Sequence, residues 1–381
     1  MLKFTALPPL SLYVHIPWCV RKCPYCDFNS HEARAAIPEK EYVEALLRDL
    51  EQDLPRAWGR KVHSIFIGGG TPSLLSPEAI ERLLSGLRAR LPLDQDIEIT
   101  LEANPGTVEL ERFKGFRAAG VNRLSIGIQS FDPEKLQALG RIHGRDEALR
   151  AAEEARAAGF ENFNLDLMFG LPQQAVEQAL SDIRTAIGLQ PTHLSVYQLT
   201  IEPNTLFHAR PPALPDDDST WEMQSRLQAE LAATGYRQYE ISAYAKPGYE
   251  CRHNLNYWKF GDYLGIGAGA HAKISDAGSI TRLWKLKQPN DYLRTAGTPV
   301  NIGGEDRLSR ENIVTEFMMN ALRLTAGIPS CLFAERTGLP ISVVARPLEQ
   351  AERRGLITWD TQFLRPTETG FRYLNNLLEL F

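Results

Sequence analysis

The chain has 381 residues, of which 43% are hydrophobic and 23% are charged. This length and composition predict one large domain with a smaller second one, and they exclude a disordered or fibrous protein. The formal net charge of −5 argues against binding to nucleic acid, and no apolar run is long enough to span a membrane, which leaves only a peripheral membrane contact open.

Short β-type apolar runs alternate with amphipathic stretches of helical length through the first half of the chain. Strands are expected to begin at Leu12, Ser64, Ile97, Arg123, Asn162 and Leu194. Helices are expected over residues 39–54, 77–90, 108–119, 145–158 and 175–189. Six such units predict an α/β fold, an incomplete (βα)6 barrel, in which ligands gather at the carboxyl ends of the strands.

The alternation weakens after about Leu206. A proline-rich segment at 210–215 is expected to be a linker, because it precedes a helical stretch over 218–234. A strand-like run rich in tyrosine follows at 236–244. This part of the chain is interpreted as an extension of the barrel.

From Arg310 onwards, two or three expected helices precede two short strand candidates at 355–359 and 363–366, which could form a hairpin. This order is typical of a small α+β winged-helix-like module. Without a basic recognition stripe, the module is interpreted as a packing or partner-binding unit. The predicted division is a partial barrel (1–206), a barrel extension (207–305) and a C-terminal winged-helix-like module (306–381).

Three cysteines lie within eight residues at C-x3-C-x2-C spacing: Cys19, Cys23 and Cys26. Three thiolates can hold three irons of a cubane [4Fe-4S] cluster and leave the fourth iron open to another ligand. A structural zinc site is the alternative, and it would recruit His15, His31 or Cys251 as a fourth ligand. A disulfide is disfavoured because the five cysteines are an odd number and no signal peptide is evident. The chain is therefore expected to be cytoplasmic, where thiols stay reduced.

Tyr25 directly precedes the third cysteine, and with it residues 1–30 resemble the opening of a radical S-adenosylmethionine (SAM) enzyme. In that family, the amino and carboxylate groups of SAM chelate the open iron, and an electron from the cluster splits the sulfonium to a 5′-deoxyadenosyl radical. The resemblance implies that the three cysteines ligate a [4Fe-4S] cluster and that Tyr25 lies beside the adenine. Without the resemblance, Tyr25 would be interpreted as a loop aromatic packed on its own turn.

A glycine run, Gly68-Gly-Gly-Thr-Pro72, follows the second predicted strand and lets a ligand approach the backbone closely. In isolation it could equally be a tight strand-to-helix turn. After the cysteine loop, it resembles the segment that hydrogen-bonds the amino group of SAM. The resemblance assigns Gly69, Gly70 and Thr71 to cofactor binding.

Further polar residues come from the next predicted strands and the loops after them: Glu102, Gln129, Arg141 and Asp166. Glu102 could accept hydrogen bonds from ribose hydroxyls or cap the following helix. Arg141 could pair with the carboxylate of SAM, because a planar guanidinium matches a carboxylate bidentately. Asp166 lies in an otherwise apolar strand, and the barrel mouth supplies a partner for its charge more readily than a dry core.

Together with Tyr13, these motifs resemble in order and spacing those of the oxygen-independent coproporphyrinogen III oxidases over the first half of the chain. The resemblance implies SAM contacts for Tyr13, Glu102, Gln129, Arg141 and Asp166. Two features depart from that family. Phe28 stands where the oxidases normally carry a fourth cysteine, and the stretch before the cysteine loop is shorter than their usual arm.

A third feature, His253-Asn-x-x-Tyr257-Trp258, is the pattern associated with HemW-type heme chaperones, which the whole chain resembles. An imidazole can ligate heme iron, and Tyr257 and Trp258 offer flat apolar faces to a macrocycle. The alternative for His253 is a hydrogen-bonded loop histidine beside two core aromatics. His271, among glycines, and Cys251 are the other candidate ligands, although a buried cysteine is usually inert.

The resemblance implies a heme chaperone that binds a [4Fe-4S] cluster, SAM and heme as cargo, and passes heme to acceptor hemoproteins. A SAM-dependent homodimer is a further expectation, and no residue is assigned a catalytic role. The alternative is oxygen-independent coproporphyrinogen III dehydrogenase, which converts two propionates to vinyl groups by two radical events. A cluster-bearing regulator that uses the C-terminal module is a third class, and the net negative charge argues against it.

Overall fold

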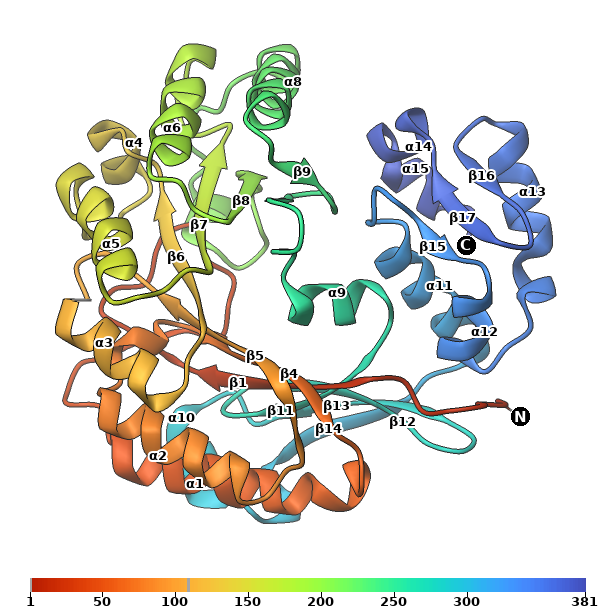
Figure 1. The fold of residues 1–381 in the computed structure, drawn as a ribbon, viewed down its shortest axis with the longest axis horizontal. Helices are drawn as coiled ribbons and strands as arrows, with labels where there is room; N and C mark the ends of the chain where they lie inside the picture. The colour runs from red at the N-terminus through yellow and green to blue at the C-terminus, as the bar shows by residue number, and fades with distance from the viewer. Residues whose placement is uncertain (1, 108–109) are drawn as a thin grey trace.

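The computed structural model describes residues 2–107 and 110–381, which form an α/β barrel domain and a small C-terminal module (Figure 1). The predicted strands are β1 (Leu10–Ile16), β4 (Val62–Gly69), β5 (Leu93–Ala103), β6 (Arg123–Gln129), β7 (Phe163–Phe169) and β8 (His193–Gln198). The predicted helices are α1 (Glu39–Asp53), α2 (Pro77–Arg88), α3 (Leu110–Ala119), α5 (Arg145–Ala157) and α6 (Val176–Gly188). The predicted alternation is confirmed to within a few residues. The first two residues of the helix expected over 108–119 lie outside the described residues.

Helix α2 shows why these segments fold as they do. The Ser76 hydroxyl accepts a hydrogen bond from the Ala79 amide, and Pro77 fixes the first turn, so the helix start is capped. The apolar residues recur at helical spacing, and they are buried: Ile80, Leu83, Leu84 and Leu87. Burying each of these side chains contributes about 1.5–3 kcal/mol, which holds the helix against the sheet.

Four strands beyond the predicted six extend the sheet past β1: β11 (Asp262–Ile266), β12 (His271–Ser275), β13 (Ile280–Lys285) and β14 (Ile302–Arg307). At the other edge lie β10 (Ala243–Ala245) and β9 (Arg237–Gln238). The strand order is β14-β13-β12-β11-β1-β4-β5-β6-β7-β8-β10-β9. Since β11 also runs parallel to β1, the parallel part of the barrel has one strand more than the six predicted.

Two buried lysines stabilise this extension: Lys285 joins it to α1, and Lys273 pairs within it. Lys285 Nζ lies 2.6 Å from both Asp49 Oδ1 and Asp53 Oδ2 of α1. Lys273 Nζ lies 2.8 Å from Asp262 Oδ1. These side chains are almost fully buried, and a buried charge is tolerated only when it is paired in this way. Such charged positions also interrupt the apolar pattern, which explains why sequence analysis missed β12 and β13.

The C-terminal module has the helix, strand and hairpin order expected for a winged-helix-like unit. Its elements are α11 (Arg310–Ala321), β15 (Ile328–Pro329), α12 (Cys331–Thr337), α13 (Ala345–Arg353), β16 (Ile357–Trp359), β17 (Phe363–Pro366), α14 (Glu368–Arg372) and α15 (Leu374–Leu378). The predicted hairpin is confirmed, because β16 and β17 pair in antiparallel orientation. Its hydrophobic core includes Phe317 and Phe333, and Leu2, Phe260 and Ile280 from the rest of the chain join the same cluster.

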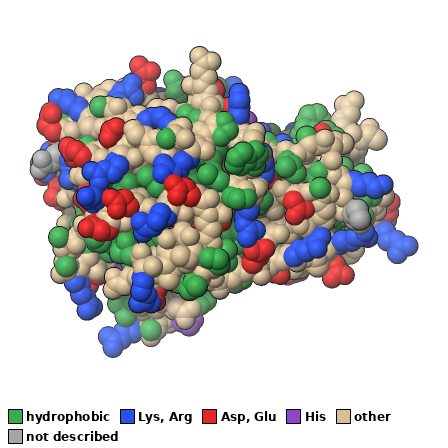
Figure 2. All heavy atoms as spheres, turned by 90° about the horizontal axis from the view of Figure 1, so that it is seen from below, with side chains coloured by type: hydrophobic (Ala, Val, Ile, Leu, Met, Phe, Trp, Pro, Cys, Tyr) green, Lys and Arg blue, Asp and Glu red, His purple; other side chains and the backbone are tan. Residues whose placement is uncertain are grey.

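A short helix, α9 (Arg252–Trp258), lies between the barrel and the C-terminal module (Figure 1). No helix within residues 2–107 and 110–381 is both long and apolar enough to cross a membrane. On the face seen in Figure 2, basic and acidic side chains lie next to one another over the barrel.

Candidate functional site

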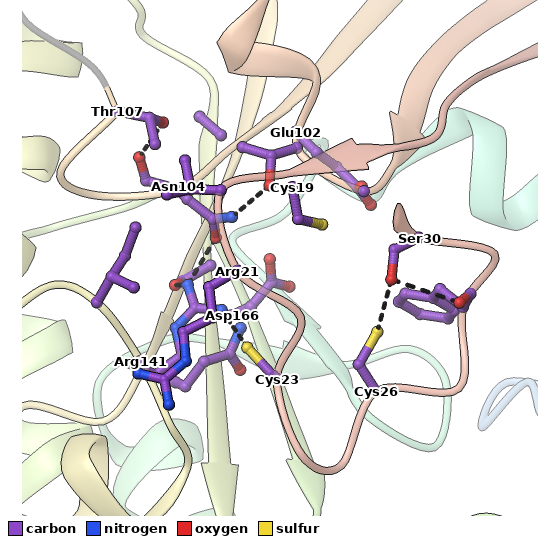
Figure 3. Close-up of a pocket in the computed structure, with 18 of the residues that line it drawn as sticks. Cys19, Arg21, Cys23, Cys26, Ser30, Glu102, Asn104, Thr107, Arg141 and Asp166 are labelled. Carbon is purple, nitrogen blue, oxygen red and sulfur yellow. Dashed lines mark hydrogen bonds between the residues drawn. The ribbon is translucent and has the colours of Figure 1, made fainter. Parts of the chain in front are cut away.

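A cavity of about 290 Å³ opens at the carboxyl ends of the parallel strands, and we call it the cluster cavity. Cys19, Cys23 and Cys26 line it from the loop after β1 (Figure 3). Eight of the nine residues predicted to contact SAM line the same cavity: Tyr25, Gly69, Gly70, Thr71, Glu102, Gln129, Arg141 and Asp166. Residues that are far apart in the sequence therefore converge on one space.

The cysteine loop is closed at its base by the strands β2 (Trp18–Cys19) and β3 (His31–Glu32), which pair in parallel. Four backbone hydrogen bonds fix this base: Gly70 N–H to Ile16 O (2.7 Å), Thr71 N–H to Trp18 O (2.8 Å), His31 N–H to Pro17 O (2.7 Å) and Ala33 N–H to Cys19 O (2.8 Å). A Cβ on Gly70 would lie only 2.5 Å from Trp18 O. The glycine is thus required for the close approach of the loop to β4.

The three loop cysteines are free, half-buried thiols that line one cavity. Among the described residues, no group of three His, Cys, Asp or Glu side chains is close enough to hold one metal ion. Zinc needs four ligands around one point, whereas a cubane cluster takes its cysteines at separate corners. The proposed fourth zinc ligand His15 is also occupied, since its ring contacts the Tyr13 hydroxyl and the Asn29 carbonyl.

Burial raises the pKa of the Cys19 and Cys26 thiols above the ordinary value. The Ser30 hydroxyl, 3.7 Å from Cys26 Sγ, partly opposes this effect for Cys26 (Figure 3). The thiolates that bind iron would therefore form together with metal binding, with release of their protons.

The amide groups of the glycine run are already used within the protein. Gly69 N–H donates to Glu102 Oε2 at 3.0 Å, and the amides of Gly70 and Thr71 donate to the base of the cysteine loop. The groups left for a ligand are carbonyl oxygens. Since the N–H bonds of an amino group donate hydrogen bonds, these acceptors suit the contact with the amino group of SAM that the resemblance implies.

Hydrogen bonds within the protein fix the Arg141 side chain in the cluster cavity (Figure 3). Its Nη2 donates to Asn104 Oδ1 at 2.6 Å and to Gly127 O at 2.7 Å, and its Nη1 lies 3.7 Å from Cys23 Sγ. Asn104 in turn donates to the Thr71 hydroxyl at 2.9 Å. Sequence analysis missed Asn104 as a site residue, although it directly follows β5 in the segment Ala103-Asn-Pro-Gly106.

Two buried carboxyl groups form the polar floor of this cavity. Burial, followed by repulsion from Asp166, raises the pKa of Glu102 to about 8, and the Gly69 amide offsets only part of the effect. Burial also raises the pKa of Asp166, which accepts hydrogen bonds from Asn164 (2.8 Å) and Ser125 (3.1 Å). At neutral pH, Glu102 is largely protonated and can both donate to and accept from a hydroxyl group.

Two further polar side chains of the cluster cavity, Gln129 and Tyr197, come from the ends of β6 and β8. Gln129, at the end of β6, has a positive φ of 69° and accepts a 2.6 Å hydrogen bond from the Tyr197 hydroxyl. This bond fixes the side-chain amide of Gln129, which the sequence predicted as a SAM contact. Tyr197 also lines the cavity and was not predicted from the sequence. Its only sequence signal is its place near the end of a predicted strand.

A second cavity, of about 370 Å³, adjoins the cluster cavity and shares Phe28, Gly69 and Glu102 with it. Tyr13, predicted to contact SAM, lines this second cavity instead of the first. Tyr257 and His271 line it as well. The hydrogen bond between Glu102 and the Gly69 amide therefore lies in the wall between the two spaces.

His253, the first residue of the His-Asn-x-x-Tyr-Trp pattern, lies in the protein interior with only 1% of its surface exposed. Its Nδ1 is 3.0 Å from the Ser64 hydroxyl, and its Nε2 is 3.1 Å from the Tyr257 hydroxyl. Burial, with a smaller contribution from Arg123, lowers its pKa to about 3. Since both ring nitrogens are engaged, this conformation favours a structural histidine over an axial heme ligand.

Of the other heme candidates in this region, Trp258 and Cys251 do not line the second cavity, whereas Tyr257 does. Trp258 packs against the C-terminal module, and the Arg323 guanidinium lies 4.2 Å from its ring centre. Tyr257 and Trp258 both line a third cavity of about 210 Å³, and only Tyr257 also lines the second cavity. Cys251 is fully buried, and burial raises the pKa of its thiol to about 12.

Comparisons with known proteins agree with the site. The family model of the Radical SAM superfamily matches residues 13–186, and that of the HemN C-terminal domain matches residues 308–373. The fold is similar to the solved structure of coproporphyrinogen III oxidase (HemN) from Escherichia coli, a radical SAM enzyme. The two superpose with a TM-score of 0.82 at 25% identity. That match covers 98% of this chain and 90% of the other.

Full-length sequence similarity is higher to a second group of proteins. The chain is 54% identical to the heme chaperone HemW of Escherichia coli (strain K12), with 98% of each chain covered. It is 52% identical to heme chaperone HemW of Haemophilus influenzae over 98% of each chain, and 37% identical to that of Bacillus subtilis over 91% and 92%. Because this similarity runs through both the barrel and the C-terminal module, the chain belongs to the HemW family of the radical SAM superfamily.

Proposed function

We propose that this chain is a heme chaperone, which binds a [4Fe-4S] cluster, SAM and heme and passes the heme to acceptor hemoproteins. One observation carries the proposal: three cysteines and eight predicted SAM residues converge on one cavity, beside a second cavity with aromatic walls. The name heme chaperone, which full-length relatives carry, supports the same function.

In this proposal, Cys19, Cys23 and Cys26 hold the cluster. When bound, such a cluster supplies one open iron to which the amino and carboxylate groups of SAM can bind. Arg141 then pairs with the carboxylate, and the glycine-run carbonyls accept from the amino group. Because Asn104 and Gly127 already fix the guanidinium, little side-chain entropy is lost when this ion pair forms.

The remaining residues orient the nucleoside part of SAM. Glu102 and Asp166 offer carboxyl groups to ribose hydroxyls, and Gln129 is fixed for a polar contact by Tyr197. Tyr25 lines the cluster cavity from the cysteine loop, with its ring 6.4 Å from that of Phe207, so that an aromatic surface is available to the adenine.

The second candidate is oxygen-independent coproporphyrinogen III oxidation, which the close fold match to HemN favours. Phe28, at the position of the oxidases' fourth cysteine, is 62% exposed and lines both cavities. A phenylalanine carries no thiol and cannot supply the chemistry of that cysteine, so this residue argues for the chaperone.

An anaerobic titration with heme tests the two candidates on the same cluster-reconstituted protein. Uptake of heme, transfer to an apo-hemoprotein and no formation of protoporphyrinogen from coproporphyrinogen III, SAM and reductant are expected. Porphyrinogen turnover without heme retention would establish the oxidase instead. A F28C variant is the matched control, because it restores the oxidase cysteine pattern.

We further propose a SAM-dependent homodimer and a peripheral membrane contact. Exposed apolar side chains at the rim of the cluster cavity support a docking role for this end of the barrel: Val20, Phe28 and Ile142. Sedimentation velocity with and without SAM tests the dimer, and a constant monomer would contradict it. Flotation with anionic lipid vesicles tests the membrane contact.

A further inference from the structure

Three histidines lie at or near the second cavity, and their ring nitrogens differ in availability. Both nitrogens of His15 are engaged, by the Tyr13 hydroxyl and the Asn29 carbonyl, each at 2.9 Å. Both nitrogens of His253 are engaged as described above. The imidazole of His271, in contrast, is exposed, lines the cavity and has no hydrogen-bond partner within residues 2–107 and 110–381.

We infer that the second cavity is the heme site and that His271 is the axial ligand of the heme iron. This inference rests on the proposed heme-chaperone function and names the site where the cargo is held. An iron ligand needs a lone pair that is free and reachable, and His271 meets both conditions where His15 and His253 do not.

The surroundings of His271 suit a flat, amphipathic ligand. Tyr13, Tyr257, Tyr263 and Phe28 line the cavity and offer apolar ring faces. The exposed Lys287 lies in the same lining and supplies a positive charge for a propionate. The volume of about 370 Å³ falls within the range of small-molecule pockets.

A neighbouring aromatic ring packs against the His271 imidazole. It stacks on Trp284, with ring centres 6.1 Å apart and an interplanar angle of 26°. Trp284 lies opposite His271 in the register between β12 and β13, so the sheet extension fixes this pair. A stacked imidazole keeps its edge, which carries both nitrogens, free for a metal.

The cysteine loop is attached directly to this cavity. Asn29 Nδ2 donates to the carbonyl oxygens of Ala268 and Lys287, both at 2.9 Å. Gly269, with φ +77°, permits this contact, because a Cβ there would lie 2.5 Å from Asn29 Nδ2. The turn before His271 and the segment after β13 that carries Lys287 are thus held against the loop that carries the cysteines.

The test compares heme binding by wild type, H271A and H271G with a matched control, H208A. His208 is an exposed histidine on α7 (Leu206–Ala209) and does not line the second cavity. Ferric heme is titrated into the cluster-reconstituted, full-length protein, and the Soret band is recorded beside the cluster content. We expect H271A to weaken heme binding at least about tenfold and to change the Soret band, and imidazole to restore the wild-type band in H271G.

Metal-free protoporphyrin IX is the second probe, because it presents the same rings and propionates without iron. Its affinity should be the same for wild type and H271A, since the aromatic walls and Lys287 are unchanged. It should fall for K287E. A wild-type protein that binds no heme would overturn the proposed function itself. Heme binding by wild type with an unchanged affinity and Soret band in H271A would overturn only the assignment of His271 and its cavity.

Discussion

Replacement of His253 by alanine separates a structural role of this residue from a role in binding heme. In the structure, the imidazole joins the Ser64 and Tyr257 hydroxyls and packs between the rings of Phe66 (5.1 Å) and Tyr257 (4.8 Å). Ser64 keeps a second hydrogen bond, to Ser11 at 2.8 Å, whereas the described contacts of the Tyr257 hydroxyl include no other side-chain partner. H253A therefore both opens a cavity and leaves one buried hydroxyl unpaired.

The expected cost follows from these two losses. An unpaired buried hydroxyl costs about 1–3 kcal/mol. The loss of a buried ring costs about another 2–3 kcal/mol, if the site collapses only in part. A total of about 3–6 kcal/mol would lower the melting temperature of the barrel by on the order of 10 °C.

Thermal unfolding followed by circular dichroism, under anaerobic conditions, measures this effect. H253Q should recover part of the loss, because its amide can donate and accept, and H208A should melt like wild type. Heme affinity is measured at a temperature where H253A is folded, and it should stay within about twofold of wild type. If H253A kept the wild-type melting temperature and lost the Soret band, the interior role of His253 would be refuted.

Three further outcomes are expected. R141K should weaken SAM binding about tenfold or more by calorimetry, because lysine loses the planar fork fixed by Gly127, and unchanged affinity would remove this residue from the site. K285A should lower the free energy of unfolding in urea by about 3–5 kcal/mol, since Asp49 loses its buried partner; a loss under about 1 kcal/mol would contradict this. The His253 pKa of about 3 means that the fold keeps the ring neutral, so its contribution to stability is complete above pH 6.5 and is lost as the pH falls towards 3. H253Q should flatten stability in that pH window, and an unaltered pH profile would show that His253 does not titrate as described.

Much of the cluster cavity could be predicted because its signals are local. The cysteine spacing, the glycine run and the polar residues near strand ends each lie within a short stretch, and parallel strands bring their carboxyl ends together at one edge. Asn104 and Tyr197 also lie near strand ends, but this position alone did not reveal their roles. Their roles come from hydrogen bonds to Arg141 and Gln129, which are formed only in the folded barrel.

The heme candidates show the opposite case, since their roles depend on distant parts of the chain. His253 is engaged by Ser64, which lies 189 positions earlier in the sequence. Trp258 is covered by Arg323 of the C-terminal module, and His271 is left free. No periodicity or spacing could distinguish these residues. The strands β12 and β13 were missed for a related reason, because their buried lysines are stabilised by acidic partners outside the strands.

The attachment of the cysteine loop to the barrel determines when a cluster can be inserted. Its backbone is tied to the barrel at the base, and between Val20 and Ser30 one described bond joins its backbone to the backbone of the rest of the fold, from Phe207 N–H to Pro24 O. The other ties involve side chains, chiefly those of Asn29, His15 and Arg141. Such a segment can open locally without melting β1 or β4, as a unit of low stability on a stable frame. Insertion of a [4Fe-4S] cluster can therefore follow the folding of the barrel.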